Sequence, residues 1–137
     1  MQQLGCTTLE QSKKLVETGL DPNTADMFYS RRPTGKSDYS IFPDFKPEGR
    51  LEVFTKVDLP CWSLGALLTL MPKTMKGIPA KAAYHLTLKE NVYNAWECNY
   101  EHFSFGELYE FPAQPTPIEA AVYTILWLLE RGYIGKV

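Results

Sequence analysis

The chain has 137 residues, of which 45% are hydrophobic and 22% are charged, and its formal net charge is −2 at pH 7. This length and composition are typical of a globular protein, so we predict a single domain spanning residues 1–137. The acidic pI of about 5.7 argues against a strongly basic nucleic-acid-binding domain.

The three cysteines, Cys6, Cys61 and Cys98, are an odd number without a C-x-x-C pair. A disulfide framework is therefore not expected, and free thiols in a reducing compartment predict a cytoplasmic protein. The longest uncharged apolar run covers residues 120–129, about half of the roughly 20 residues that a membrane-spanning helix needs. We therefore predict neither a membrane span nor a membrane partner.

The first elements are a short helix, a brief strand and a long irregular segment. Two successive threonines offer capping boxes to a helix over about residues 9–18, which ends at Gly19. Residues 27–29 are apolar enough for a brief strand. Residues 30–50 are rich in proline, glycine and aromatic residues, which predicts a loop that packs down and is either functional or mobile.

Strand, helix and loop patterns alternate through the middle of the chain. Gly65 lies inside a helical pattern and indicates close packing, since glycine costs a helix about 1 kcal/mol relative to alanine. The predicted elements are strands over residues 51–57, 84–89, 92–100 and 103–111, a helix over residues 64–71, a basic loop over residues 73–81 and a turn at residues 90–91.

The last helix is the most strongly marked element. Thr116 is its N-cap, Pro117 its first residue and Glu119 the partner in a capping box, while Gly132 lies just past its end. Its apolar stripe consists of Ile118, Ala121, Val122, Ile125, Leu126, Leu128 and Leu129. Its opposite side holds Glu119, Thr124, Glu130 and Arg131, together with Tyr123 and Trp127.

The order of the elements indicates the fold class. Neighbouring strands joined by short turns favour an antiparallel sheet with helices on one face. We therefore predict an α+β fold, in which a small antiparallel sheet carries about three helices and the C-terminal helix packs on the sheet.

No stretch carries a recognisable catalytic, cofactor-binding or metal site, and we predict no cofactor. Residues 30–37 end like a phosphate-binding loop but lack its first glycine and the helix that should follow. Cys98 and His102 lie about 13 Å apart if their segment is a strand, too far to share a metal ion. Cys61, a histidine and Asp58 could form a nucleophilic set, but no local signature marks them.

The aromatic pair on the polar side of the last helix is the best lead to function. Aromatic residues are enriched in binding hot spots, so Tyr123 and Trp127 form our candidate interaction surface. Two interpretations stay open: the preceding segment covers the pair internally, or the pair faces a partner. Nucleic acid would have to stack on Tyr39, Phe42 and Phe45, which the acidic pI and the prolines disfavour.

Several short stretches together are similar to a known group of proteins. They are residues 9–15 with residues 19–20, residues 24–27, residues 60–64 with residues 67–68, and residues 119–121 with residues 127–130. The pattern resembles small uncharacterised proteins of Bacteroides-type gut bacteria, their prophages and mobile elements. The resemblance implies a cytoplasmic accessory protein and transfers no catalytic residue. It marks Asp26 and Trp62 for attention, with a turn or cap role for Asp26 and a core role for Trp62 as the structural alternatives.

Three functional hypotheses follow from these observations. The first is an accessory protein that acts by protein–protein interaction or self-association through Tyr123 and Trp127. The second is a small hydrolase or nucleotide-handling enzyme whose site carries no known signature. The third is a nucleic-acid-associated accessory protein that uses the basic middle of the chain. We favour the first, because the fold of the last helix does not require an aromatic pair on its polar side.

Overall fold

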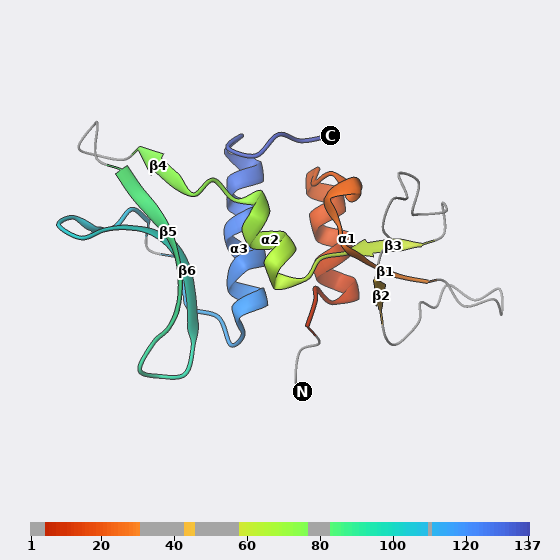
Figure 1. The fold of residues 1–137 in the computed structure, drawn as a ribbon, viewed down its shortest axis with the longest axis horizontal. Helices are drawn as coiled ribbons and strands as arrows, with labels where there is room; N and C mark the ends of the chain where they lie inside the picture. The colour runs from red at the N-terminus through yellow and green to blue at the C-terminus, as the bar shows by residue number, and fades with distance from the viewer. Residues whose placement is uncertain (1–4, 31–42, 46–57, 77–82, 110) are drawn as a thin grey trace.

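The computed structural model describes residues 5–30, 43–45, 58–76, 83–109 and 111–137. Within them, three α-helices accompany two antiparallel sheets (Figure 1), which confirms the predicted α+β class. The helices are α1 (Leu9–Thr18), α2 (Leu64–Leu70) and α3 (Pro117–Glu130), with a 3₁₀ turn, η1, at Pro22–Thr24. The strands are β1 (Met27–Tyr29), β2 (Asp44–Phe45), β3 (Leu59–Cys61), β4 (Thr74–Lys76), β5 (Ala83–Glu90), β6 (Trp96–His102) and β7 (Gly106–Glu107).

Helix α3 stands between the larger sheet and the two other helices. The sheet, with strand order β4-β5-β6-β7, lies on one side of α3, and α2 and α1 lie on the other (Figure 1). The buried residues of α3 are Ile118, Ala120, Ala121, Val122, Thr124, Ile125, Leu128 and Leu129. The predicted apolar stripe and the packing of the C-terminal helix on the sheet are therefore confirmed, although Leu126 is only half-buried.

The sequence places Thr124 on the polar side of the last helix, and this prediction is wrong. The Thr124 side chain is fully buried, and its hydroxyl donates to the carbonyl oxygen of Cys98 at 2.7 Å. The helix is covered from two sides, so its buried surface extends beyond the apolar stripe. A buried hydroxyl is tolerated there because its hydrogen bond to β6 replaces the lost contact with water.

Helix α1 begins and ends as its sequence predicts, and α3 shows the Thr116 half of its predicted capping box and the predicted glycine after its end. A capping box opens α1, and the Thr116 hydroxyl accepts a hydrogen bond from the Glu119 N–H at 3.1 Å at the start of α3. Both helices end at a left-handed glycine, with φ of +112° at Gly19 and +77° at Gly132. Backbone hydrogen bonds of the Schellman type follow each glycine and satisfy the last carbonyl groups.

The main hairpin differs from its prediction at the turn. The sequence predicts a two-residue turn and a second strand over residues 92–100, whereas β6 begins only at Trp96. The carboxamide oxygen of Asn91 accepts hydrogen bonds from the N–H groups of Tyr93 and Ala95, at 2.9 and 3.1 Å. Because this side chain satisfies the backbone of the turn, a longer loop replaces the start of the predicted strand.

Other predictions for the middle of the chain change or stay open. The predicted basic loop over residues 73–81 contains β4, which pairs with the start of β5, and the predicted strand over residues 103–111 is reduced to β7. The close packing expected at Gly65 is wrong, since a Cβ atom there would have its nearest neighbour 3.9 Å away. The predicted strand over residues 51–57 and most of the loop over residues 30–50 lie outside the described residues.

The smaller sheet has the strand order β2-β1-β3 and lies beside α1 (Figure 1). Strand β1 is the brief strand that the sequence predicts. Cys6, Met27, Tyr29, Leu59 and Cys61 form a second, smaller core at this sheet. The described residues thus form one large apolar core around α3, which includes the rings of Trp62, Tyr84 and Tyr100, and one small core that contains two cysteines.

Candidate interaction surface

The candidate surface depends on the segment that leads to α3. Its residues Leu108 and Gln114 lie along the same edge of β6 as β7 does. The Leu108 N–H donates to the Tyr100 carbonyl at 2.8 Å, where the segment begins. Trp96 and Gln114 exchange two backbone hydrogen bonds, at 2.7 and 2.8 Å, where the segment ends. The segment therefore covers this edge of the sheet.

Between these two anchor points the segment bulges away from the strand. The chain has five residues between Leu108 and Gln114, but β6 has only three between Trp96 and Tyr100, so the outer segment has more chain than β6 has pairing positions. The Asn99 side-chain amide donates to the Tyr109 carbonyl and so satisfies a backbone group that the bulge removes from the ladder. The bulge brings the rings of Tyr109 and Phe111 onto α3.

We define the aromatic cluster as the rings of Tyr109, Phe111, Tyr123, Trp127 and Tyr133. The Trp127 ring is central, with its centroid 4.2 Å from that of Tyr109 and 5.3 Å from that of Phe111. It also stacks on Tyr133, with the centroids 5.7 Å apart and the ring planes 12° apart. Tyr123 joins the cluster through an edge-to-face contact with Phe111 at 5.7 Å. Rings at these separations attract each other.

The aromatic cluster is partly covered and partly open. Trp127 and Phe111 are half-buried, whereas Tyr123 is 41% exposed and Tyr133 is 49% exposed. The segment before α3 thus gives Trp127 the internal cover that one interpretation of the sequence expects, and it leaves two tyrosine rings in solvent. Sequence reasoning misses the three rings that do not belong to α3, because no helical pattern links them to it.

Charge and hydrogen bonding act on the cluster at the C-terminal end of α3. The guanidinium carbon of Arg131 lies 5.0 Å from the Trp127 ring centroid, where a cation attracts the face of a ring. Burial and a hydrogen bond with Tyr133 raise the pKa of Tyr109, and Arg131 partly offsets this rise. Tyr109 is therefore neutral at physiological pH. A surface of packed rings beside a guanidinium group suits non-covalent recognition better than acid–base chemistry.

Asp26 and Trp62 join the turn before β1 to the start of α2. The Asp26 carboxylate accepts hydrogen bonds from the Ser63 N–H at 2.9 Å and from the Ser63 hydroxyl at 2.5 Å. Ser63 is the N-cap of α2, so Asp26 fixes the start of that helix. Trp62 is fully buried, and its indole N–H donates to the Thr24 hydroxyl at 3.0 Å. Both side chains therefore have roles in the architecture.

Among the described residues, the structure does not bring together the cysteines and histidines that the sequence offers for catalysis or metal binding, and most of the phosphate-loop-like stretch at residues 30–37 lies outside them. Cys98 is buried beside the sulfur of Met71, whereas His102 lies at the end of β6 and stacks on Phe103. Cys61 belongs to the smaller sheet, and both histidines belong to the larger one. Within the described part of the chain, no three His, Cys, Asp or Glu side chains are close enough to hold a metal ion.

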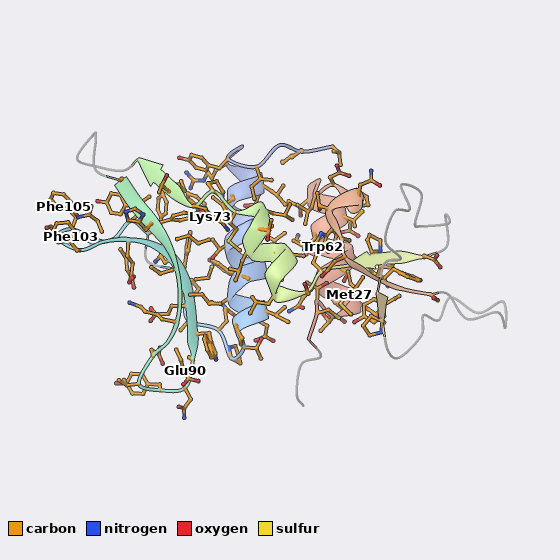
Figure 2. All side chains as sticks on the ribbon, in the orientation of Figure 1. Met27, Trp62, Lys73, Glu90, Phe103 and Phe105 are labelled. Atoms are coloured by element: carbon orange, nitrogen blue, oxygen red, sulfur yellow. The ribbon has the colours of Figure 1, made fainter. Side chains whose placement is uncertain are left out.

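Exposed rings also lie at two turns of the larger sheet, and sequence reasoning misses them. Phe103 is 98% exposed at the turn between β6 and β7, and Tyr93 is 86% exposed in the loop between β5 and β6. Figure 2 shows Phe103 and Phe105 at the far end of the larger sheet, away from Trp62. These turn residues provide exposed rings outside the aromatic cluster with which the cluster can be compared.

The fold and the surface define a small α+β protein with a packed, partly open set of rings along its C-terminal helix. Comparisons with protein-family models, with curated proteins and with solved structures find no match for the chain. A functional proposal must therefore rest on the residues themselves. Among the described residues, each helix is too short or too polar to cross a bilayer.

Proposed function

We propose that the protein acts by binding protein through the aromatic cluster, and that the partner is a second copy of the chain. The observation that carries this proposal is the exposure of Tyr123 and Tyr133 beside the packed ring of Trp127. Single exposed rings scattered over a surface are ordinary, whereas packed and partly open rings are typical of binding hot spots. An accessory protein is also what the resemblance to small proteins of Bacteroides-type prophages implies.

The rings of the cluster are held in position without a partner. Trp127 lies on α3, whose inner side is anchored in the large core. Tyr109 and Phe111 belong to a segment that backbone hydrogen bonds attach to β6 on both sides of its bulge. Rings that are already ordered lose little conformational entropy on binding, so contact with them increases affinity.

The charges at the end of α3 favour a second copy of the chain as the partner. Glu130 and Arg131 are adjacent in the sequence, and both are exposed. In a two-fold symmetric pair the same patch meets itself, so the glutamate of one copy can face the arginine of the other. Two adjacent charges of opposite sign are therefore self-complementary, whereas a patch of a single sign would repel its copy.

Sedimentation velocity over a concentration series tests this proposal. We expect the sedimentation coefficient of the wild type to rise with concentration, and the Tyr123→Ala/Tyr133→Ala variant to lose that rise. Tyr93→Ala is the matched control, because it removes an exposed ring outside the cluster and should associate like the wild type. Circular dichroism verifies that each variant is folded.

The possible results separate the parts of the proposal. A wild type that stays monomeric throughout the series rejects self-association. A folded double variant that associates as strongly as the wild type rejects the cluster as the interface. Capture of a different protein that depends on Tyr123 and Tyr133, together with a monomeric wild type, would keep the binding role and replace the partner.

A further inference from the structure

Two of the three cysteines meet in the smaller core. Cys6 pairs with Ser63 in an antiparallel bridge, which places residues 6–7 against residues 62–63. Cys61 lies two residues before Ser63, and side chains two residues apart in an extended chain point to the same face. Cys6 and Cys61 are therefore diagonal neighbours, and both side chains are fully buried.

A hydrogen-bonded tyrosine completes the surroundings of the pair. The Tyr29 hydroxyl lies 3.7 Å from the Cys6 sulfur and 2.9 Å from the Thr7 carbonyl oxygen, so its one proton can be donated to either acceptor. A hydrogen bond from the Cys61 thiol, with a smaller effect from Tyr29, lowers the pKa of Cys6 to about 7 despite its burial. The same hydrogen bond and burial raise the pKa of Cys61. The Cys6 sulfur has both the Cys61 thiol and the Tyr29 hydroxyl beside it, so we assign Cys6 as the nucleophile of the pair.

We propose that Cys6 and Cys61 are a redox-active dithiol that hydrogen peroxide oxidises to an intramolecular disulfide. The Cys6 thiol loses its proton and the resulting thiolate sulfur attacks one peroxide oxygen. The O–O bond breaks, and the released hydroxide takes up the proton that Cys6 lost and leaves as water, so that Cys6 becomes a sulfenic acid. The Cys61 sulfur then attacks the Cys6 sulfur and the S–O bond breaks. The second hydroxide takes the Cys61 proton as water. The two sulfurs together give two electrons to one peroxide.

The burial of the two sulfurs selects both the oxidant and the product. A small neutral oxidant reaches a fully buried sulfur more readily than a bulky disulfide does. A sulfenic acid formed at Cys6 has the Cys61 thiol beside it, so the two condense in place. Cys98 provides an internal comparison, because burial raises its pKa and its sulfur neighbour is the thioether of Met71. Cys98 therefore cannot form a disulfide with this neighbour, because the thioether of Met71 has no thiol group.

Peroxide treatment of the folded Cys98→Ser protein tests the proposal. After unfolding, alkylation and peptide mapping, we expect a cross-linked peptide pair that contains Cys6 and Cys61, and a monomer mass lowered by two hydrogen atoms. Dithiothreitol should restore both thiols. Two thiols that remain open to alkylation, a sulfinic acid at Cys6 without a cross-link, or disulfides between chains would each overturn the proposal.

The oxidation rate tests the role of each group. The rate should rise as the pH rises, because the Cys6 thiolate is the attacking form and its pKa is lowered by the neighbouring Cys61 thiol. Tyr29→Phe removes the hydroxyl beside the Cys6 sulfur and should lower the rate, whereas Tyr93→Phe removes an exposed hydroxyl elsewhere and should not. A rate that is independent of pH, or unchanged in folded Tyr29→Phe protein, contradicts the assignment of Cys6 as the nucleophile.

Discussion

The inner and outer sides of α3 differ in the type of side chain that they carry and in how far those side chains are exposed. The inner side is mainly aliphatic and is covered by the larger sheet, α1 and α2. The outer side carries Tyr123 and Trp127, which contact rings from other segments and stay partly exposed. Burial of aliphatic surface drives folding, and folding does not need partly exposed rings. Substitutions on the inner side should therefore change stability, and substitutions on the outer side should change association.

The largest expected effect lies on the inner side of α3. Leu128 is fully buried, so Leu128→Ala leaves a cavity and should lower the free energy of unfolding by about 3 kcal/mol. Urea denaturation measures this loss. Leu126→Ala is the matched control. Leu126 is half-buried on the same helix, so its replacement should lower the free energy of unfolding by less. Equal losses in the two variants would show that depth of burial does not distinguish the sides of the helix.

A smaller loss should follow when the contact that positions α2 against the inner side is removed. Asp26→Ala takes away the acceptor for both the N–H and the hydroxyl of Ser63, and should lower the free energy of unfolding by about 2 kcal/mol. Asp21→Ala is the control, because its side chain accepts one exposed hydrogen bond from Asn23. Thermal denaturation compares the two variants. If the free energy of unfolding fell no further in Asp26→Ala than in Asp21→Ala, Asp26 would not fix the start of α2.

The buried Thr124 hydroxyl between α3 and β6 should contribute less to the free energy of unfolding than Asp26 does. Thr124→Val keeps the shape of the side chain but removes the donor to the Cys98 carbonyl, so we expect a loss of about 1 kcal/mol in urea denaturation. Thr69→Val removes a hydroxyl that donates to the Gly65 carbonyl at an exposed position, and should be nearly neutral. A neutral Thr124→Val variant would mean that the bond between helix and sheet adds no stability.

One substitution should raise stability without touching either side of α3. Gly65 is exposed on α2 with open space around its Cα, so Gly65→Ala should raise the free energy of unfolding by about 0.5–1 kcal/mol. Gly132→Ala is the opposite control, because its φ of +77° strains any residue with a Cβ atom. Denaturant midpoints of the two variants should move in opposite directions. A destabilised Gly65→Ala variant would instead support the close packing at Gly65 that the sequence suggests.

The smallest expected change in stability lies on the outer side of α3. Tyr123→Ala removes a ring that is 41% exposed, and it should leave the free energy of unfolding within about 0.5 kcal/mol of the wild type. The same variant should weaken association in sedimentation experiments. A loss as large as that of Leu128→Ala would instead make the Tyr123 ring part of the core.

Sequence reasoning succeeds where the signal is local. The caps of α3, its buried stripe and its place on the sheet follow from residues within one helix, and the structure confirms them. It fails for Thr124 because the helix has neighbours on two sides, which a single apolar stripe does not reveal. It also misses β4, because this strand pairs through its backbone and has only one buried apolar residue, Met75.

The parts that the sequence could not predict depend on contacts between distant residues. The aromatic cluster needs the bulge that Asn99 supports at Tyr109, and no pattern within either segment specifies that contact. The meeting of Cys6 and Cys61 depends on the bridge between Cys6 and Ser63, which joins the start of the chain to the segment after β3. An odd cysteine count therefore excludes a disulfide framework without excluding one close pair of thiols.

Hydrogen–deuterium exchange at low and high protein concentration tests the central claim most directly, because it locates an interface without any substitution. We expect slower exchange at high concentration in residues 108–114 and 131–134, which flank the aromatic cluster, and unchanged exchange in the loop at residues 91–95. Slower exchange confined to residues 91–95 or to the turn at residues 103–105 would contradict the account. Exchange that does not depend on concentration anywhere would contradict self-association through the cluster.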